Sequence, residues 1–156
     1  MTTETAGEPR IIDILLVEDN PGDIRLTRKA FEKAKLHNRL HVARTGQQAL
    51  DFMFGSGDDE AQVADLVLLD LKLPDYDGLD ILREIKQDPK LRRIPVVVLT
   101  SSDAEEDIVE SYDRYANAFL SKPVDFNDLV SMVREIDDFW VSLVKLAPPV
   151  HEEGDA

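Results

Sequence analysis

The sequence predicts an α/β protein in which five parallel strands alternate with helices, as a (βα)5 chain. Five short apolar runs rich in Val, Ile and Leu recur along the chain, and each is followed by a polar turn and then by residues with helical spacing. Strands that are apolar along most of their length indicate a parallel sheet with helices on both faces. Right-handed crossovers at this chain length favour the doubly wound strand order 2-1-3-4-5.

The predicted strands are too short to be helices and are rich in Ile, Leu and Val. The first strand is interrupted only by Asp13, and the third is followed directly by Asp70. Runs of this length and composition are typical of buried strands. In chain order, the expected strands are residues 11–17, 40–43, 66–69, 95–99 and 116–120.

The predicted helices are recognised from their apolar spacing and from the residues at their ends. Asn20 as N-cap and Pro21 as first helical residue begin the first helix. Thr45 begins a capping-box pattern before the second helix, which stops at Gly55, and Asp125 caps the last one. In chain order, the expected helices are residues 21–36, 46–54, 79–87, 103–115 and 126–146.

The composition fits one acidic domain with short tails. The 156 residues include 18 Lys and Arg against 32 Asp and Glu, a formal net charge of -14. Such a surface repels a phosphate backbone, so we expect no nucleic-acid partner. No signal-peptide pattern or membrane-length apolar run is present, which predicts no membrane association and a cytoplasmic location. We expect residues 10–147 to form the domain with an extended last helix, and residues 1–9 and 148–156 to be disordered tails.

Polar side chains follow four of the predicted strands at one edge of the sheet. Glu18 and Asp19 follow the first strand, and Asp70 ends the third. Thr100 ends the fourth strand and Lys122 follows the fifth. In an open parallel sheet these ends meet in the crevice where such folds bind ligands. Each residue also has an ordinary interpretation, as a helix cap, a turn residue or a surface lysine, but their joint placement favours a functional site.

The grouping of acids predicts a metal-assisted phosphoryl acceptor. Three like charges close together repel one another unless they bind protons or a cation. Oxygen ligands suit Mg²⁺, and no cysteine or histidine stands at these strand ends to favour zinc. Glu18, Asp19 and Asp70 would balance the charges of Mg²⁺ and Lys122, and Asp70 would be the nucleophile that forms an aspartyl phosphate. Because the chain has no glycine-rich phosphate loop, the phosphoryl donor must be another molecule.

Four short motifs together resemble the receiver domain of two-component response regulators. The resemblance covers residues 11 to about 138, and the combination of motifs is highly specific. The motifs are Val17-Glu18-Asp19-Asn20, then Leu69-Asp70-Leu71-Lys72-Leu73-Pro74 with Gly78, then Leu99-Thr100-Ser101, and finally Leu120-Ser121-Lys122-Pro123.

This resemblance implies the flavodoxin-like fold of the family and a role for each matching residue. Asp70 would be the phosphoacceptor of a protein that catalyses only its own phosphorylation and dephosphorylation. Mg²⁺ would be held by Glu18, Asp19, Asp70 and the backbone carbonyl of Lys72. The other implied roles are phosphoryl stabilisation by Thr100, Ser101 and Lys122, a switch at Thr100 and Phe119, and a cis peptide bond between Lys122 and Pro123.

The resemblance also implies partners. Gly22, Asp23 and the Arg-Leu-Thr that follows suggest the subgroup associated with phytochrome-type sensor kinases, so we expect a sensor histidine kinase of that type as phosphodonor. The chain is expected to be a stand-alone receiver that signals by contact with a downstream protein. From its length and exposed apolar residues, the last helix should overhang the domain and form a homodimer together with the fifth strand and the fourth helix. The alternative is that this segment folds back on its own domain. The candidate dimer residues are Phe139, Trp140, Leu143 and Val144.

Two other functions share parts of this pattern. A Mg²⁺-dependent phosphohydrolase with an aspartyl-phosphate intermediate commonly needs a second carboxylate two residues after the nucleophile, where this chain has Lys72. A flavodoxin-like FMN carrier needs phosphate-cradling and ring-stacking residues, which the strand ends lack. Both alternatives are therefore weaker than the receiver interpretation.

Overall fold

The chain folds as a parallel sheet between two layers of helices. The computed structural model describes residues 11–35, 37–100, 118–122 and 125–135. The elements are β1 (Ile12–Val17), α2 (Pro21–Ala34), β2 (Asn38–Ala43), α3 (Gly46–Phe54), β3 (Leu66–Asp70), α4 (Gly78–Gln87), β4 (Val96–Thr100) and β5 (Ala118–Ser121). Residues 126–135 are also helical. All neighbouring strands are parallel in the order β2-β1-β3-β4-β5, which confirms the predicted doubly wound topology.

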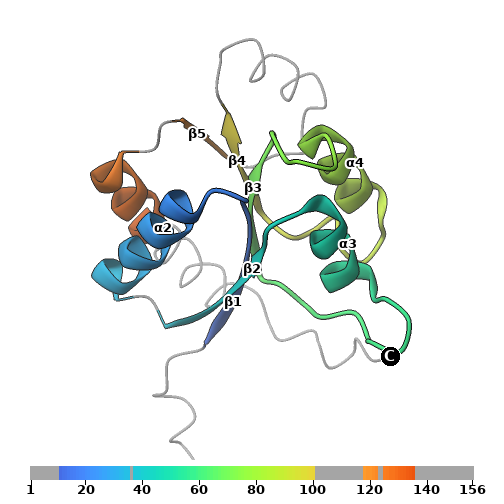
Figure 1. Ribbon diagram of the computed structural model, residues 1–156. Coiled ribbons are helices and arrows are strands. Elements are labelled where there is room, and N and C mark those ends of the chain that lie inside the picture. The colour runs from blue at the N-terminus through green and yellow to red at the C-terminus, as the bar shows by residue number, and fades with distance from the viewer. Residues whose placement is uncertain (1–10, 36, 101–117, 123–124, 136–156) are drawn as a thin grey trace, which may run out of the picture.

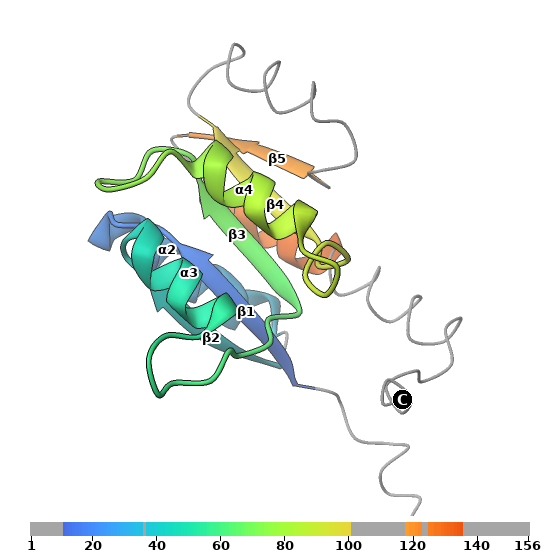
Figure 2. The same ribbon diagram turned by 90° about the vertical axis from the view of Figure 1, so that its right-hand side faces the viewer.

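Helices cover both faces of the sheet, which is why the central strands are almost entirely apolar. α2 and the helical residues 126–135 lie on one face, and α3 and α4 lie on the other (Figure 1). In the view rotated by 90° about the vertical axis, α3 and α4 lie in front of the strands (Figure 2). Successive strand residues point to opposite faces, so each central strand contributes to two cores. One core contains Leu15, Val17, Val67, Leu69, Val96 and Val98, and the other contains Ile12, Ile14, Leu16, Leu66, Leu68 and Val97.

Several element boundaries differ from the sequence prediction by one or two residues, and two of the differences have a clear physical reason. β2 begins at Asn38, two residues earlier than expected, because the parallel ladder with β1 extends through polar residues: Ile12 pairs with Asn38 and its N–H donates to the carbonyl of His37 at 3.0 Å. α2 ends at Ala34, before the predicted residue 36, because Lys35 adopts a left-handed conformation with φ of 61°. Hydrogen bonding and backbone geometry, which hydrophobic patterns do not report, decide both positions.

The predicted helix starts are present, with one correction. Asn20 accepts a hydrogen bond from the Asp23 N–H at 2.9 Å and Pro21 is the first residue of α2. Thr45 Oγ1 accepts from the Gln48 N–H at 3.1 Å, as predicted for an N-cap. A capping box also requires Gln48 to bond back to the Thr45 N–H. Instead, Gln48 Oε1 accepts from the N–H of Arg44 at 2.7 Å, one residue earlier.

Several predicted segments lie outside the described residues. These are the helix at 103–115, the overhanging part of the last helix and both tails, so the domain bounds 10–147 stay a prediction. For the last helix, the cap at Asp125 accepts from the Asp128 N–H at 3.1 Å. Within the part of the chain that the structure describes, no helix combines the length and apolar character needed to cross a lipid bilayer.

Asp13, the one charged residue in β1, is explained by its partners on the edge strand. Its Oδ1 accepts from Arg39 Nε at 2.8 Å and lies 3.0 Å from His41 Nε2, and both partners belong to β2. These hydrogen bonds, chiefly that of Arg39, lower the pKa of Asp13 from 3.8 to about 2, against the opposing effect of burial. A lowered folded-state pKa means that the ionised carboxylate stabilises the fold above the unfolded pKa, and that this contribution disappears as the pH falls towards 2.

The variant Asp13→Asn tests this pH dependence. At pH 7 we expect it to lower the free energy of unfolding by about 1 kcal/mol, a value reduced for solvent screening at this partly exposed pair. The difference from wild type should vanish between pH 4 and pH 2, as measured by urea unfolding. Asp80→Asn, at an exposed ion pair with Arg83 on α4, is the matched control and should change stability by less than about 0.5 kcal/mol at either pH. A pH-independent effect of Asp13→Asn would contradict the interpretation.

Candidate functional site

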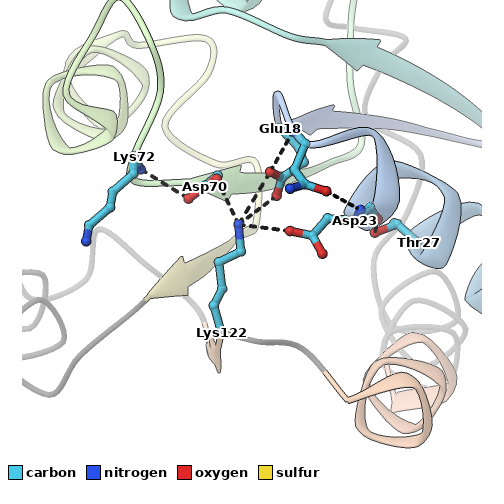
Figure 3. A network of polar contacts seen from close by, with 7 residues as sticks. Glu18, Asp23, Thr27, Asp70, Lys72 and Lys122 are labelled. Carbon is cyan, nitrogen blue, oxygen red and sulfur yellow. Dashed lines mark hydrogen bonds and ion pairs between the residues drawn. The ribbon is translucent and has the colours of Figure 1, made fainter.

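The strand order brings side chains from three strand ends together. Glu18 follows β1, Asp70 ends β3, and Lys122 follows β5 and extends its side chain across the edge of the sheet (Figure 3). Lys122 Nζ lies 3.0 Å from Asp70 Oδ2 and 3.1 Å from Glu18 Oε1. The structure thus brings these three predicted site residues into direct contact, although 104 positions separate Glu18 from Lys122.

The site places charges where water has little access. The side chains of Glu18 and Asp70 are only 1% and 4% exposed, and that of Lys122 is 18% exposed. Buried charges are costly unless they are paired and hydrogen-bonded. The three N–H donors of the Lys122 ammonium face carboxylates of Glu18, Asp70 and also Asp23, whose Oδ2 lies 3.2 Å from Nζ. The ammonium is therefore the cation that makes this burial possible in the described structure.

Asp23 is the site residue that sequence reasoning missed. Its position in the first turn of α2 was used only as a mark of a subgroup, while its contact with Lys122 adds a carboxylate to the site. The sequence could have indicated this role, because α2 begins three residues after Glu18 and its first turn must lie beside that residue. The prediction balanced Mg²⁺ and Lys122 against three carboxylates, so with Asp23 included the net charge of the site is one unit more negative than predicted.

Burial and neighbouring charges shift the pKa values of Glu18 and Lys122. Burial, followed by repulsion from Asp70, raises the pKa of Glu18 from 4.5 to about 7, and Lys122 offsets part of the rise. Burial opposes the charged form of Lys122, but its hydrogen bond with Asp70 and the neighbouring negative charges raise its pKa above the ordinary value. Lys122 therefore remains protonated, and a further cation beside Glu18 would stabilise its ionised form.

Glu18, Asp19 and Asp70 form a group of carboxylates that could together hold a metal ion. Glu18, Asp19 and Asp70 each offer an oxygen, and these oxygens lie within 4.8 Å of one another. They line an open cavity of about 600 Å³ together with Asn20, Pro21, Asp23, Lys72 and Lys122. Carboxylate oxygens and room for water suit a hard divalent cation.

Backbone hydrogen bonds orient the two buried carboxylates. The N–H of Asn20 donates to Glu18 Oε2 at 3.2 Å, and the N–H of Lys72 donates to Asp70 Oδ1 at 3.1 Å. The Lys72 side chain itself points away from Asp70 (Figure 3). Each carboxylate therefore accepts one backbone hydrogen bond in addition to its contact with Lys122.

The other predicted site residues are described only in part. The backbone of Thr100 ends β4 and pairs with Ser121, and Phe119 lies in β5 opposite Val98. Ser101, Pro123 and the dimer candidates Phe139, Trp140, Leu143 and Val144 lie outside the described residues. The roles of these residues stay predictions.

Comparisons with known proteins identify the family of this chain. The family model described as the response regulator receiver domain matches residues 14–134. The chain belongs to this family. It is 40% identical over 145 residues to response regulator Rcp1 of Synechocystis sp., a match that covers 92% of this chain and 97% of Rcp1.

Solved receiver structures have the same fold. The Mn²⁺-bound form of Rcp1 is 41% identical, with a TM-score of 0.71 and coverage of 88% of this chain and 99% of that one. The phosphorylated cyanobacterial phytochrome response regulator RcpA is 40% identical, with a TM-score of 0.73 and coverage of 86% and 97%. Receiver domains bind Mg²⁺ or Mn²⁺ at an acidic pocket, and the cluster of Glu18, Asp19 and Asp70 fits such a pocket.

Replacement of Lys122 tests the electrostatic account of the site. Lys122→Met keeps a long side chain but leaves Glu18 and Asp70 without their cation, so without Mg²⁺ at pH 8 we expect a loss of about 2 to 4 kcal/mol in the free energy of unfolding. Because Glu18 already has a raised folded-state pKa, the variant should gain a proton there, and its deficit should shrink at pH 6.

Urea unfolding at both pH values, with and without Mg²⁺, measures this effect. Mg²⁺ should stabilise Lys122→Met more than wild type, because no ammonium competes for the carboxylates. The Lys29→Met variant, at an exposed position of α2 outside the cavity, is the control and should behave as wild type in stability. An equal deficit at pH 6 and pH 8, unaffected by Mg²⁺, would contradict the account.

Proposed function

We propose that Asp70 is the phosphoacceptor of this response regulator and that a sensor histidine kinase supplies the phosphoryl group. The observation that carries the proposal is the contact of the buried Asp70 with Lys122, beside two further carboxylates that can hold a divalent ion. In the reaction, Asp70 Oδ2 forms a bond to phosphorus while the bond from phosphorus to the histidine nitrogen of the donor breaks. A lone pair of the Asp70 oxygen forms the new O–P bond, and the histidine nitrogen leaves with the electron pair of the broken P–N bond.

The residues around Asp70 provide the electrostatic environment for this transfer. Glu18, Asp19, Asp70 and the backbone carbonyl of Lys72 would hold Mg²⁺, which supplies charge neutralisation on the phosphoryl oxygens. The Lys122 ammonium, already 3.0 Å from Asp70 Oδ2, stabilises the negative charge that arrives with the phosphoryl group. Asp23 retains an ion pair with Lys122 and so keeps the ammonium in place.

The downstream response is proposed from the same family membership. Thr100 and Ser101 would donate hydrogen bonds to the phosphoryl group, and Thr100 and Phe119 would transmit the change to a partner surface. The phytochrome response regulators among the similar structures support a phytochrome-type kinase as donor, and contact with a downstream protein would carry the signal onward. Dimerisation through the last helix, a cytoplasmic location and the cis Lys122–Pro123 bond complete the proposal.

The phosphohydrolase alternative is not favoured. Lys72 occupies the position at which such an enzyme commonly has its acid or base, and its side chain is exposed and points away from Asp70. The chemistry supported by the site is stoichiometric acceptance of a phosphoryl group by the protein itself.

Incubation with acetyl phosphate and Mg²⁺, followed by intact-protein mass spectrometry, tests the proposal. We expect one phosphoryl group per chain in wild type, none in Asp70→Asn, none in wild type with EDTA, and wild-type labelling in Asp80→Asn. Peptide mapping after borohydride reduction should place the modification on Asp70. Sustained phosphate release with no labelled protein would favour the hydrolase instead, and labelling of Asp70→Asn would exclude Asp70 as acceptor.

A further inference from the structure

The two ends of the loop between β3 and α4, residues 71–77, form its base and are hydrogen-bonded to each other next to Asp70. The Gly78 N–H donates to the Leu71 carbonyl at 2.9 Å, and Lys72 forms an antiparallel bridge with Asp77. A Cβ on Gly78 would lie 2.5 Å from Leu71 Cα and 2.7 Å from the Asp70 carbonyl oxygen, so only glycine allows this approach. Because the base is closed, a displacement of the loop tip must move the backbone of Lys72 as well.

The loop tip is attached to another element, the first turn of α3. Asp75 Oδ1 accepts from the Gly46 N–H at 2.7 Å, and Oδ2 accepts from the Gln47 N–H at 3.0 Å. With Thr45 bonded to the next N–H, the first-turn donors of α3 are satisfied by side chains. Although desolvation opposes the shift, the backbone N–H groups lower the pKa of the Asp75 carboxyl, so it is ionised at neutral pH.

Tyr76 forms the second part of this attachment. Its hydroxyl donates to Gln47 Oε1 at 3.0 Å, and its ring lies over Gly46. A Cβ on Gly46 would lie 2.5 to 2.8 Å from three Tyr76 side-chain atoms. Since Gly46 is a helical residue without a left-handed backbone, glycine is required there by the position of Tyr76 and not by the conformation of α3.

We propose that Asp75 and Tyr76 are positioning residues that hold the Lys72 backbone in register with the carboxylates of the metal site. The inference rests on the proposed function, because it concerns the Lys72 carbonyl as a ligand of the divalent ion. Neither residue lines the cavity of Glu18, Asp19 and Asp70, so both act through the loop. The pair couples the metal affinity of the β3 edge to a helix on the face of the sheet.

A purely structural alternative is that Asp75 only caps α3. Two substitutions with opposite effects on α3 separate the possibilities. Asp75→Asn loses the charge and one of the two acceptor oxygens and so weakens α3, whereas Gly46→Ala raises the helix propensity of α3 but displaces Tyr76. Both substitutions weaken the attachment of the loop tip. If loop position sets metal affinity, both must weaken Mg²⁺ binding, whatever their effect on stability.

Isothermal titration with Mg²⁺ and labelling with acetyl phosphate are the measurements. We expect the dissociation constant for Mg²⁺ to rise about tenfold in both variants, as is typical when residues that support metal ligands are removed. Labelling should be slow at limiting Mg²⁺ and return to near the wild-type rate at saturating Mg²⁺, because Asp70 and Lys122 are unchanged. Tyr76→Phe, which loses one hydrogen bond only, should fold normally and raise the dissociation constant about threefold.

Asp80→Asn, which removes a charge from α4 without touching the loop tip, should bind Mg²⁺ as wild type does. Wild-type Mg²⁺ affinity in Asp75→Asn and Gly46→Ala, with only the melting temperature changed, would overturn the inference and leave the proposed function intact. A wild-type protein that neither binds Mg²⁺ nor becomes labelled would refute the proposed function, and the inference with it.

Discussion

The burial of two carboxylates around one ammonium is the interaction on which the rest of this structure depends. Glu18 and Asp70 are almost inaccessible to water, and like charges in such a place are unfavourable without a cation. The cation lies 104 positions from Glu18 and 52 from Asp70 in the sequence, and the strand order β2-β1-β3-β4-β5 brings it within reach of both. The electrostatic balance of the site therefore depends on the strand order, because the sheet holds the ammonium and the two carboxylates in contact.

Hydrophobic pattern was sufficient to predict the architecture because the sheet is covered on both faces. Apolar runs in β1, β3 and β4 have no competing interpretation at their length, and right-handed crossovers leave few strand orders. The boundaries were less accessible. Asn38 joins β2 through backbone pairing with β1, and a polar residue in an edge strand carries no hydrophobic signal.

The site was predictable to the extent that strand ends determine it. Glu18, Asp70 and Lys122 follow strands, so the topology alone predicts their convergence. Asp23 reaches the same ammonium from a helix, and Asp75 bonds to backbone groups 28 and 29 positions away. Contacts of this kind depend on side-chain reach and loop path, which spacing along the sequence does not encode. The Gln48 side chain likewise accepts from the N–H of Arg44 and not from that of Thr45, a one-residue difference that local geometry decides.

Arg39 affects whether a second copy of the protein can pair with the outer strand of the sheet. β2 is an outer strand of the sheet, and the guanidinium held by Asp13 stands on it as a fixed, solvated charge. A second chain that extended the sheet at this border would have to strip water from that group and accommodate its bulk. Growth of the sheet from molecule to molecule is therefore discouraged on this side.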